Sequence, residues 1–179
     1  AGASGVNLVT RDVSARVDDG SNVTASGGVT VEAHDSLTAT SEVLALSLSV
    51  SAVAASFGVA ISNNVIATQV EAVVEASQVA AEGGDILIDA DAIHNDGDVE
   101  TIANIASIAA GLGVAGAGGE ALSVLETDVT ARATDALLTA SGAVDVDADS
   151  VDYATADIFG LGASPGLAIS ALVATGRVE

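Results

Sequence analysis

A short unit of alternating apolar and polar residues occurs three times along the chain, at residues 24–33, 80–90 and 139–148. Each unit begins with a turn of small residues and continues with valine or isoleucine at every second position. Alternation with a period of two predicts a β-strand with one buried side and one side in water. Glycine reaches backbone angles that other residues adopt only at a cost, so we expect it to shape the turns. The expected structural turn glycines are Gly27, Gly28, Gly83, Gly84 and Gly142.

The segments that precede these units also repeat. Residues 8–17, 65–74 and 124–133 align with one another, which makes Val13, Val70 and Val129 equivalent, with spacings of 57 and 59 residues. Repeats of this length predict an array of stacked units. We therefore expect an all-β fold, a β-solenoid (parallel β-helix or β-roll) of about three repeats in a single array. The predicted repeats cover approximately residues 8–64, 65–123 and 124–171, with a partial repeat at 172–179, and we expect the chain to be a segment of a longer chain or fibre.

A long uncharged stretch follows each unit, at residues 43–64, 102–119 and 158–176. In the first stretch, Leu44, Leu46 and Leu48 alternate with Ala45 and Ser47, which predicts a strand. We expect both faces of these strands to be buried, either inside a broad β-roll or against neighbouring chains. The alternative is a membrane-inserted segment, because a stretch of about 18 to 20 apolar residues can cross a bilayer as a helix. The alternation and the absence of basic flanking residues argue against membrane insertion.

Composition supports closely stacked sheets. The chain is 50% hydrophobic, yet it has only two phenylalanines, one tyrosine and no tryptophan or methionine. A core of small side chains reaches normal packing density only where backbones approach closely. There are no cysteines, which excludes disulfides and thiolate metal sites.

The chain is strongly acidic. Its net charge is -21, from 25 acidic residues against four arginines and no lysine. Binding to nucleic acid is excluded, because a phosphate backbone requires a cationic surface. An acidic surface suits a saline setting, cation binding or solubility at high local concentration.

Aligning the three units produces columns of acidic residues on the outward side. Val31, Ile88 and Val146 form an inward column, and the adjacent outward columns are Glu32, Asp89 and Asp147, then His34, Asp91 and Asp149. In stacked strands like charges would lie about 4.8 Å apart, which is unfavourable unless a cation or a raised pKa relieves the repulsion. Calcium is the cation that such oxygen ligands would bind. The alternative is a solvated face that keeps the protein soluble. The candidate calcium ligands are Glu32, Asp89, Asp91, Asp145, Asp147 and Asp149.

Other candidate chemistry is weaker. His34 and His94 lie at non-equivalent positions with no recurring third ligand, so we interpret both as exposed surface residues rather than zinc ligands. Gly111–Gly116 fits the G-x-G-x-x-G pattern of nucleotide-binding loops, but no amphipathic helix follows it. Catalysis requires one asymmetric arrangement of residues, whereas nearly every feature here recurs, so we predict that the chain is not an enzyme. Arg16 and Arg132 are equivalent, and we expect each to form a salt bridge to an acidic neighbour.

The succession of Val-x-Ala, a short turn, Val-Thr-Ala-Ser-Gly-Gly-Val-Thr-Val-x-Ala and a run such as residues 108–119 resembles the repeat region of giant bacterial surface proteins. It is most similar to leukotoxin-like filamentous adhesins, and filamentous haemagglutinin repeats are similar at the strand unit. The resemblance implies an extracellular fibre or stalk at the bacterial cell surface, with self-association or neighbouring repeats as partners and a host or neighbouring cell as a further one. It implies no catalytic or cofactor-binding residues. The alternatives are a calcium-binding surface or ligand-binding module, and a membrane-inserted segment.

Overall fold

The computed structural model describes residues 1–179, and every element in it is a β-strand. None of the elements is a helix long and apolar enough to span a bilayer. The strands are β1 (Gly2–Val17), β2 (Asn22–Ala25), β3 (Val29–Ser36), β4 (Ala39–Val50), β5 (Ala55–Glu75), β6 (Gln78–Ala81), β7 (Ile86–His94), β8 (Val99–Ala110), β9 (Val114–Thr134), β10 (Leu137–Ala140), β11 (Val144–Asp152), β12 (Thr155–Ala163) and β13 (Leu167–Val178).

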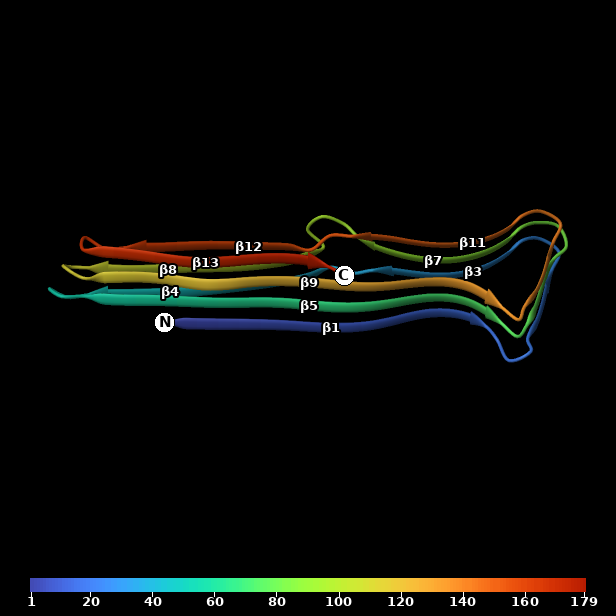
Figure 1. Cartoon of the computed structure of the whole chain (residues 1–179), viewed down its shortest axis with the longest axis horizontal. Coiled ribbons are helices and arrows are strands. Elements are labelled where there is room, and N and C mark those ends of the chain that lie inside the picture. Colours follow the sequence, from blue (N-terminus) through green and yellow to red (C-terminus); the bar gives the residue numbers. More distant parts are fainter.

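The strands form four parallel sheets that share one stacking direction. The long-strand sheet has the order β1-β5-β9-β13, the end sheet β10-β6-β2, the acidic sheet β11-β7-β3 and the leucine sheet β12-β8-β4. Each coil runs along a long strand, crosses the end sheet, and returns through the acidic sheet and then the leucine sheet (Figure 1). The predicted all-β solenoid is therefore confirmed.

The register of the sheets explains the repeat spacing. Val13 pairs with Val70 and Val70 with Val129, which are the equivalences that the sequence predicts. Elsewhere the offset between coils changes: Ala39 pairs with Val99, 60 residues later, whereas Val114 pairs with Leu167, 53 residues later. Turns of different lengths absorb these differences without disturbing the pairing.

Each coil is broad in comparison with its rise. The strands β5 and β9 contain 21 residues each, so they span roughly 70 Å at about 3.3 Å per residue. Neighbouring coils are only about 4.8 Å apart. The three coils and β13 therefore form a flat slab whose longest axis lies along the strands (Figure 1).

The two ends of this slab have different cores. Between the acidic and end sheets and the long-strand sheet lies a cluster of eleven buried residues, which includes Val70, Ile86 and Ile88. Between the leucine sheet and the long-strand sheet, the buried cluster consists of alanines with Val43 and Ile105. Serine hydroxyls also lie inside, and the Oγ atoms of Ser41 and Ser62 are 2.9 Å apart.

The leucine sheet corrects one expectation. Both of its faces were expected to be buried, but Leu44, Leu46 and Leu48 are 67%, 63% and 66% exposed, while Ala45 and Ser47 point inward. The reason is the spacing between the sheets, because an interior of alanine, serine and glycine holds the two sheets too close for leucine. Burial against another chain stays a prediction.

The expected turn glycines lie in the turns that connect the end sheet to the acidic sheet. They are needed there for a reason other than unusual backbone angles. The glycines with a positive φ are instead Gly20, Gly97 and Gly111. The turn glycines serve close approach between coils, since a Cβ on Gly84 would lie 2.7 Å from the backbone nitrogen of Gly28. The turn glycines with such a close neighbour are Gly28, Gly83, Gly84 and Gly142, whereas a Cβ on Gly27 would meet nothing within 4 Å.

Candidate functional site

The acidic sheet aligns its outward carboxylates in rows across the coils. Glu32 and Asp147 both pair with Asp89, as the sequence alignment predicts. In the next row His34 and Asp149 both pair with Asp91. The ring Nδ1 of His34 lies 3.1 Å from Asp91 Oδ2. One of the two side chains that flank Asp91 in its row is therefore a histidine, and only the other, Asp149, is a carboxylate.

Asp89 lies at the centre of these rows. Partial burial raises its pKa above the ordinary value, and the negative charges of Asp91, Asp147, Glu32 and Asp149 raise it further. The rows are therefore electrostatically unfavourable when fully ionised, and either a proton or a bound cation would relieve them.

The remaining calcium candidate is placed differently. Asp145 is aligned with Leu87 and Thr30 rather than with other carboxylates. No three histidine, aspartate or glutamate side chains converge in a geometry that could hold a metal ion. The carboxylates stand in extended rows that face the solvent, so calcium binding stays a prediction.

A second polar cluster lies inside the solenoid, where the acidic sheet meets the leucine sheet. Arg11 Nη2 is 2.6 Å from Asp35 Oδ1, and His94 Nε2 is 3.3 Å from Asp35 Oδ2. On its other side, His94 Nδ1 is 2.7 Å from Asp152 Oδ1, which also accepts a hydrogen bond from the Thr127 hydroxyl. We call these five residues the buried polar network.

The alternation of the strands places this network inside. Asp35 follows Val31 and Ala33 on the inward side of β3, and His94 is the last inward residue of β7. The side chains of Asp35 and His94 are both fully buried. The network spans three coils, because Asp35 belongs to the first, His94 to the second and Asp152 to the third.

The chemistry of the network is structural. Both ring nitrogens of His94 face carboxylates, an arrangement that offers neither nitrogen to a substrate. A buried carboxylate is costly unless polar or positively charged groups lie beside it. Beside Asp35 these groups are Arg11 and His94. Neither carboxylate oxygen of Asp35 has a hydrogen bond of good geometry. We expect such a network to fix which residue of one coil lies beside which residue of the next.

The interpretation of His94 as a surface residue is therefore wrong, whereas His34 is exposed as expected. His94 lies two residues after Ala92, which points inward from β7. The alternation of this strand was therefore enough to predict that His94 is buried. Nothing in the local sequence indicated that Arg11 lies across the interior from it.

Arg16 forms an ion pair with Glu71, as expected. Arg132 forms none, so the prediction of a salt bridge is wrong for this residue. The pairing Arg16–Val73–Arg132 is correct, but the acidic partner occurs beside only one of the two arginines.

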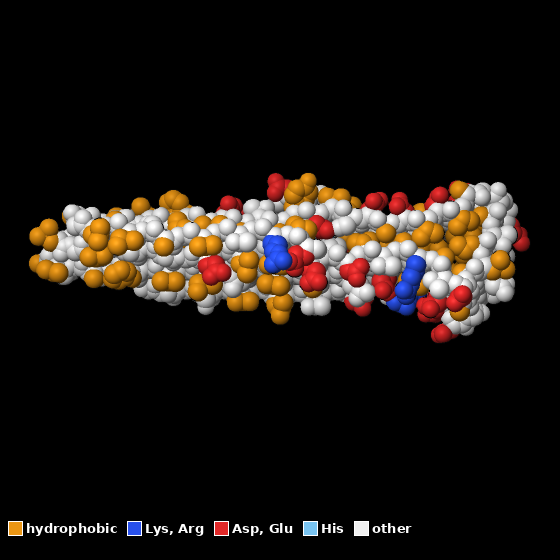
Figure 2. Space-filling view, in the orientation of Figure 1, with side chains coloured by type: hydrophobic (Ala, Val, Ile, Leu, Met, Phe, Trp, Pro, Cys, Tyr) orange, Lys and Arg blue, Asp and Glu red, His pale blue; other side chains and the backbone are white.

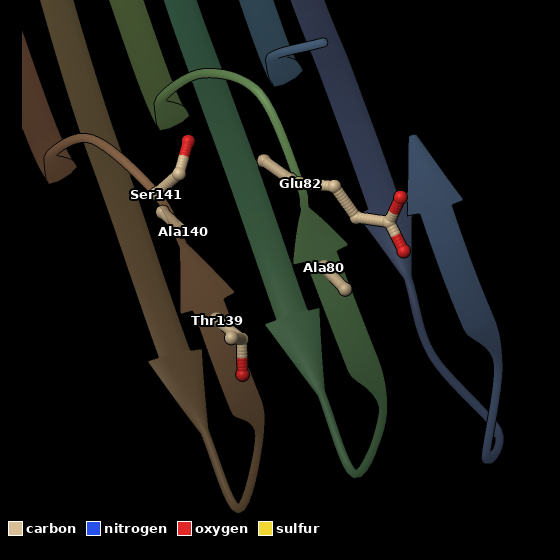
Figure 3. Close-up of a pocket in the computed structure, with 6 residues that line it drawn as sticks. Ala80, Glu82, Thr139, Ala140 and Ser141 are labelled. Carbon is tan, nitrogen blue, oxygen red and sulfur yellow. The ribbon is translucent and has the colours of Figure 1, made fainter. Parts of the chain in front are cut away.

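The surface hollows are shallow. One lies at the ends of β6 and β10 and is lined by small side chains, among them Ala80, Thr139 and Ser141, while Glu82 extends away from it (Figure 3). The segment Gly111–Gly116 forms the turn after β8 and the start of β9. A strand rather than a helix follows this glycine pattern.

No protein-family model matches the chain, and no curated protein or solved structure matches it either. The resemblance to filamentous adhesin repeats thus rests on the sequence motifs alone.

Proposed function

We propose that this chain is a structural or adhesive segment of an extracellular fibre of a bacterial surface protein. The observation that carries the proposal is the open parallel stack: every sheet ends in strands whose outer edges are unpaired, β1 to β4 at one end and β10 to β13 at the other. Unpaired strand edges are templates on which further coils add.

The dimensions favour a fibre with broad faces over a slender stalk. A coil of about 57 residues, the offset between β1 and β5, advances the stack by only about 4.8 Å. The chain therefore contributes width, roughly 70 Å per coil, more than length. Broad faces supply contact area for neighbouring fibres, and for a host or neighbouring cell.

The charge distribution supports an extracellular, crowded setting. The acidic rows repel one another and keep one part of each face solvated. Contact with other copies is then confined to the uncharged segments, which Figure 2 shows as the end of the molecule without acidic or basic side chains.

The test is electron microscopy and X-ray fibre diffraction of the isolated protein, with and without a calcium chelator. We expect fibres about 70 Å wide that survive chelation and give a 4.8 Å reflection along the fibre axis. Compact single particles in both conditions would contradict the proposal.

A calcium-binding surface is the second candidate, favoured by the aligned carboxylates and the raised pKa of Asp89. Fibres that dissolve on chelation and reform with calcium would assign this role to Glu32, Asp89, Asp91, Asp147 and Asp149. Co-flotation of the protein with liposomes would instead favour the membrane-inserted alternative.

A further inference from the structure

The end of the slab that carries no charged side chains is apolar on three sides. On the leucine sheet Leu46 and Phe159 are exposed, and on the long-strand sheet Phe57 is exposed. At the tip, where the leucine sheet turns into the long-strand sheet, Val53 is 81% and Leu112 is 76% exposed. Contiguous apolar patches on a protein surface mark interaction sites. We call this region the apolar end (residues 44–59, 104–118 and 159–173), and Figure 2 shows it at the left.

Both faces of the apolar end are continuous across the coils. On the leucine sheet, Leu46, Ala106 and Leu161 are aligned in one row. On the opposite face the ring of Phe57 covers Gly116, since a Cβ on this glycine would lie 2.6 Å from a ring carbon. Each face is therefore apolar over the full height of the stack.

The length of the apolar end matches one leaflet of a bilayer. The charged side chain nearest the tip is Asp157 on the leucine sheet and Glu120 on the long-strand sheet. Measured from the strand ends at Ala163 and Val114, both lie roughly 20 Å from the tip. The hydrocarbon of one leaflet is about 15 Å thick, and that of a whole bilayer is about 30 Å thick. The apolar end is thus long enough for one leaflet and too short for two.

The placement of these surfaces favours lipid hydrocarbon as the occupant. A protein seated on one face would leave the other face and the tip in water, whereas lipid chains surround an inserted end on all sides. Removing all three apolar sides from water is favourable. The side chains of Glu120 and Asp157 would then lie at the level of the headgroups.

The charge of the chain selects the kind of lipid. The net charge is -21, and the chain has four arginines and no lysine. Anionic headgroups repel such a surface, as a second copy of the chain also would. Zwitterionic headgroups have no net charge, so they leave the apolar contact unopposed.

Unpaired strand edges restrict insertion to the assembled fibre. In hydrocarbon each unpaired backbone N–H or C=O group is costly. A single chain has such edges at β1 and β4 on one side and at β12 and β13 on the other. In a fibre these edges remain only at its two ends, while every added coil adds apolar surface. Binding to lipid should therefore strengthen as the fibre lengthens.

We infer that the apolar end of the assembled fibre inserts edge-on into one leaflet of a bilayer of zwitterionic lipids, so that the fibre adheres to a cell through the lipid itself. The acidic rows stay in water. Only the edge of the fibre enters the membrane, which distinguishes this arrangement from a chain that is membrane-inserted on its own. The inference rests on the proposed fibre function and names the surface to which the fibre adheres.

The first test is flotation of preformed fibres with vesicles of phosphatidylcholine, alone or mixed with the anionic lipid phosphatidylglycerol. The test variant is Leu48→Asp, and the matched control is Leu137→Asp. The two leucines are 66% and 59% exposed, but Leu137 belongs to the end sheet, at the opposite end of the slab. Electron microscopy checks that both variants form fibres.

We expect fibres of the natural chain and of Leu137→Asp to float with phosphatidylcholine vesicles, and to float less as anionic lipid is added. Leu48→Asp should lower the partition into vesicles by at least about tenfold, or about 1.4 kcal/mol, because each copy then carries a carboxylate into the hydrocarbon. Fibres that stay unbound, equal flotation of the two variants, or binding that requires anionic lipid would each overturn the inference.

The depth of insertion is a second measurement, and it does not depend on a loss of binding. The absence of native cysteine makes labelling at one position specific. Val53→Cys places a fluorescent dye at the tip, and Ser14→Cys places it at an exposed position in the acidic part of β1. In bound fibres, bromine atoms on the lipid chains should quench the dye at residue 53 and leave the dye at residue 14 unchanged. Equal quenching at both positions, or at neither, would contradict insertion of the apolar end.

Failure of this inference is distinguishable from failure of the proposed function. Fibres that form without vesicles and do not float would leave the fibre proposal standing and remove only the contact with lipid. Compact particles that float would contradict the fibre and this inference together, and would favour the membrane-inserted alternative.

Discussion

The two halves of this slab share one backbone plan and oppose one another in chemistry. In the acidic half (residues 12–34, 69–93 and 128–151), valine and isoleucine such as Ile86 and Ile88 point inward and carboxylates point outward. In the uncharged half (residues 43–64, 102–119 and 158–176), alanine and serine point inward, while leucine and phenylalanine point outward. Figure 2 shows the division along the long axis.

The contrast between the halves shows that alternation defines two faces of a strand but not which face is inside. The acidic half follows the usual rule, because its outward side chains are charged. The uncharged half reverses it, since Gly58 and Gly119 face Ile105 across the interior and leave little space between the sheets. Large side chains in this half are consequently directed outward.

The buried polar network separates the two halves, and breaking it should have the largest effect. Asp35→Ala removes the buried carboxylate that the Arg11 guanidinium and His94 Nε2 both face, which leaves Arg11 without its ion-pair partner and the fully buried His94 ring with a polar neighbour on one side only. We expect the free energy of unfolding to fall by about 3 to 5 kcal/mol. Denaturant unfolding measures this, and Asp149→Ala, an exposed acidic residue, should change it by less than about 0.5 kcal/mol. Equal losses in the two variants would contradict the role of the network.

Overpacking the uncharged half should have the next largest effect. A Cβ on Gly119 would clash with Ile105 Cδ1 and lie 2.7 Å from the carbonyl oxygen of Ala60. Gly119→Ala should therefore lower the free energy of unfolding by about 1 to 3 kcal/mol. In Gly27→Ala the new methyl group meets nothing within 4 Å, so this variant is the control. An unchanged melting temperature for Gly119→Ala would show that the sheets are not closely spaced.

Acidification should stabilise the acidic half. The pKa of Asp89 is raised in the folded state, so the folded protein binds this proton more tightly than the unfolded chain does. The stability that this proton adds to the folded state is fully present below pH 3.8, the ordinary pKa of aspartate. It is lost as the pH rises through the raised pKa of Asp89 in the folded protein.

We therefore expect Asp89→Asn to be more stable than the natural chain at pH 7, with the difference shrinking toward pH 4. Thermal unfolding at both pH values measures it. Asp145→Asn, which removes a carboxylate aligned with Leu87 rather than with other carboxylates, is the matched control. If the stability gained by Asp89→Asn grew as the pH fell, the pKa of Asp89 would not be raised in the folded state.

The smallest effect concerns the two equivalent arginines. Arg16→Ala removes the ion pair with Glu71, which is partly exposed, and should cost about 0.2 to 1 kcal/mol. Arg132→Ala removes no ion pair and should leave the melting temperature unchanged. Measuring both at low and high salt provides the check, because only the Arg16 effect should weaken as salt screens the charges.

The sequence predicted the architecture well, because its signals are periodic. Alternation and the 57-residue spacing were sufficient to align Val13 with Val70 and Glu32 with Asp89. The buried polar network was not predicted, since Arg11 and His94 are brought together only by coiling. The exposure of the leucines was missed as well, because the separation of two sheets depends on residues far apart in the chain.

The most direct test of the division between the halves is sedimentation of the natural chain and of Leu46→Asp at increasing salt. Raising the ionic strength from about 0.01 M to about 1 M shortens the Debye length from 30 Å to 3 Å and screens the acidic rows. We predict that fibres of the natural chain then associate side by side into larger species, while fibres of Leu46→Asp stay separate at every salt concentration. Equal association of the two proteins, or dissociation of the natural chain by salt, would contradict the account.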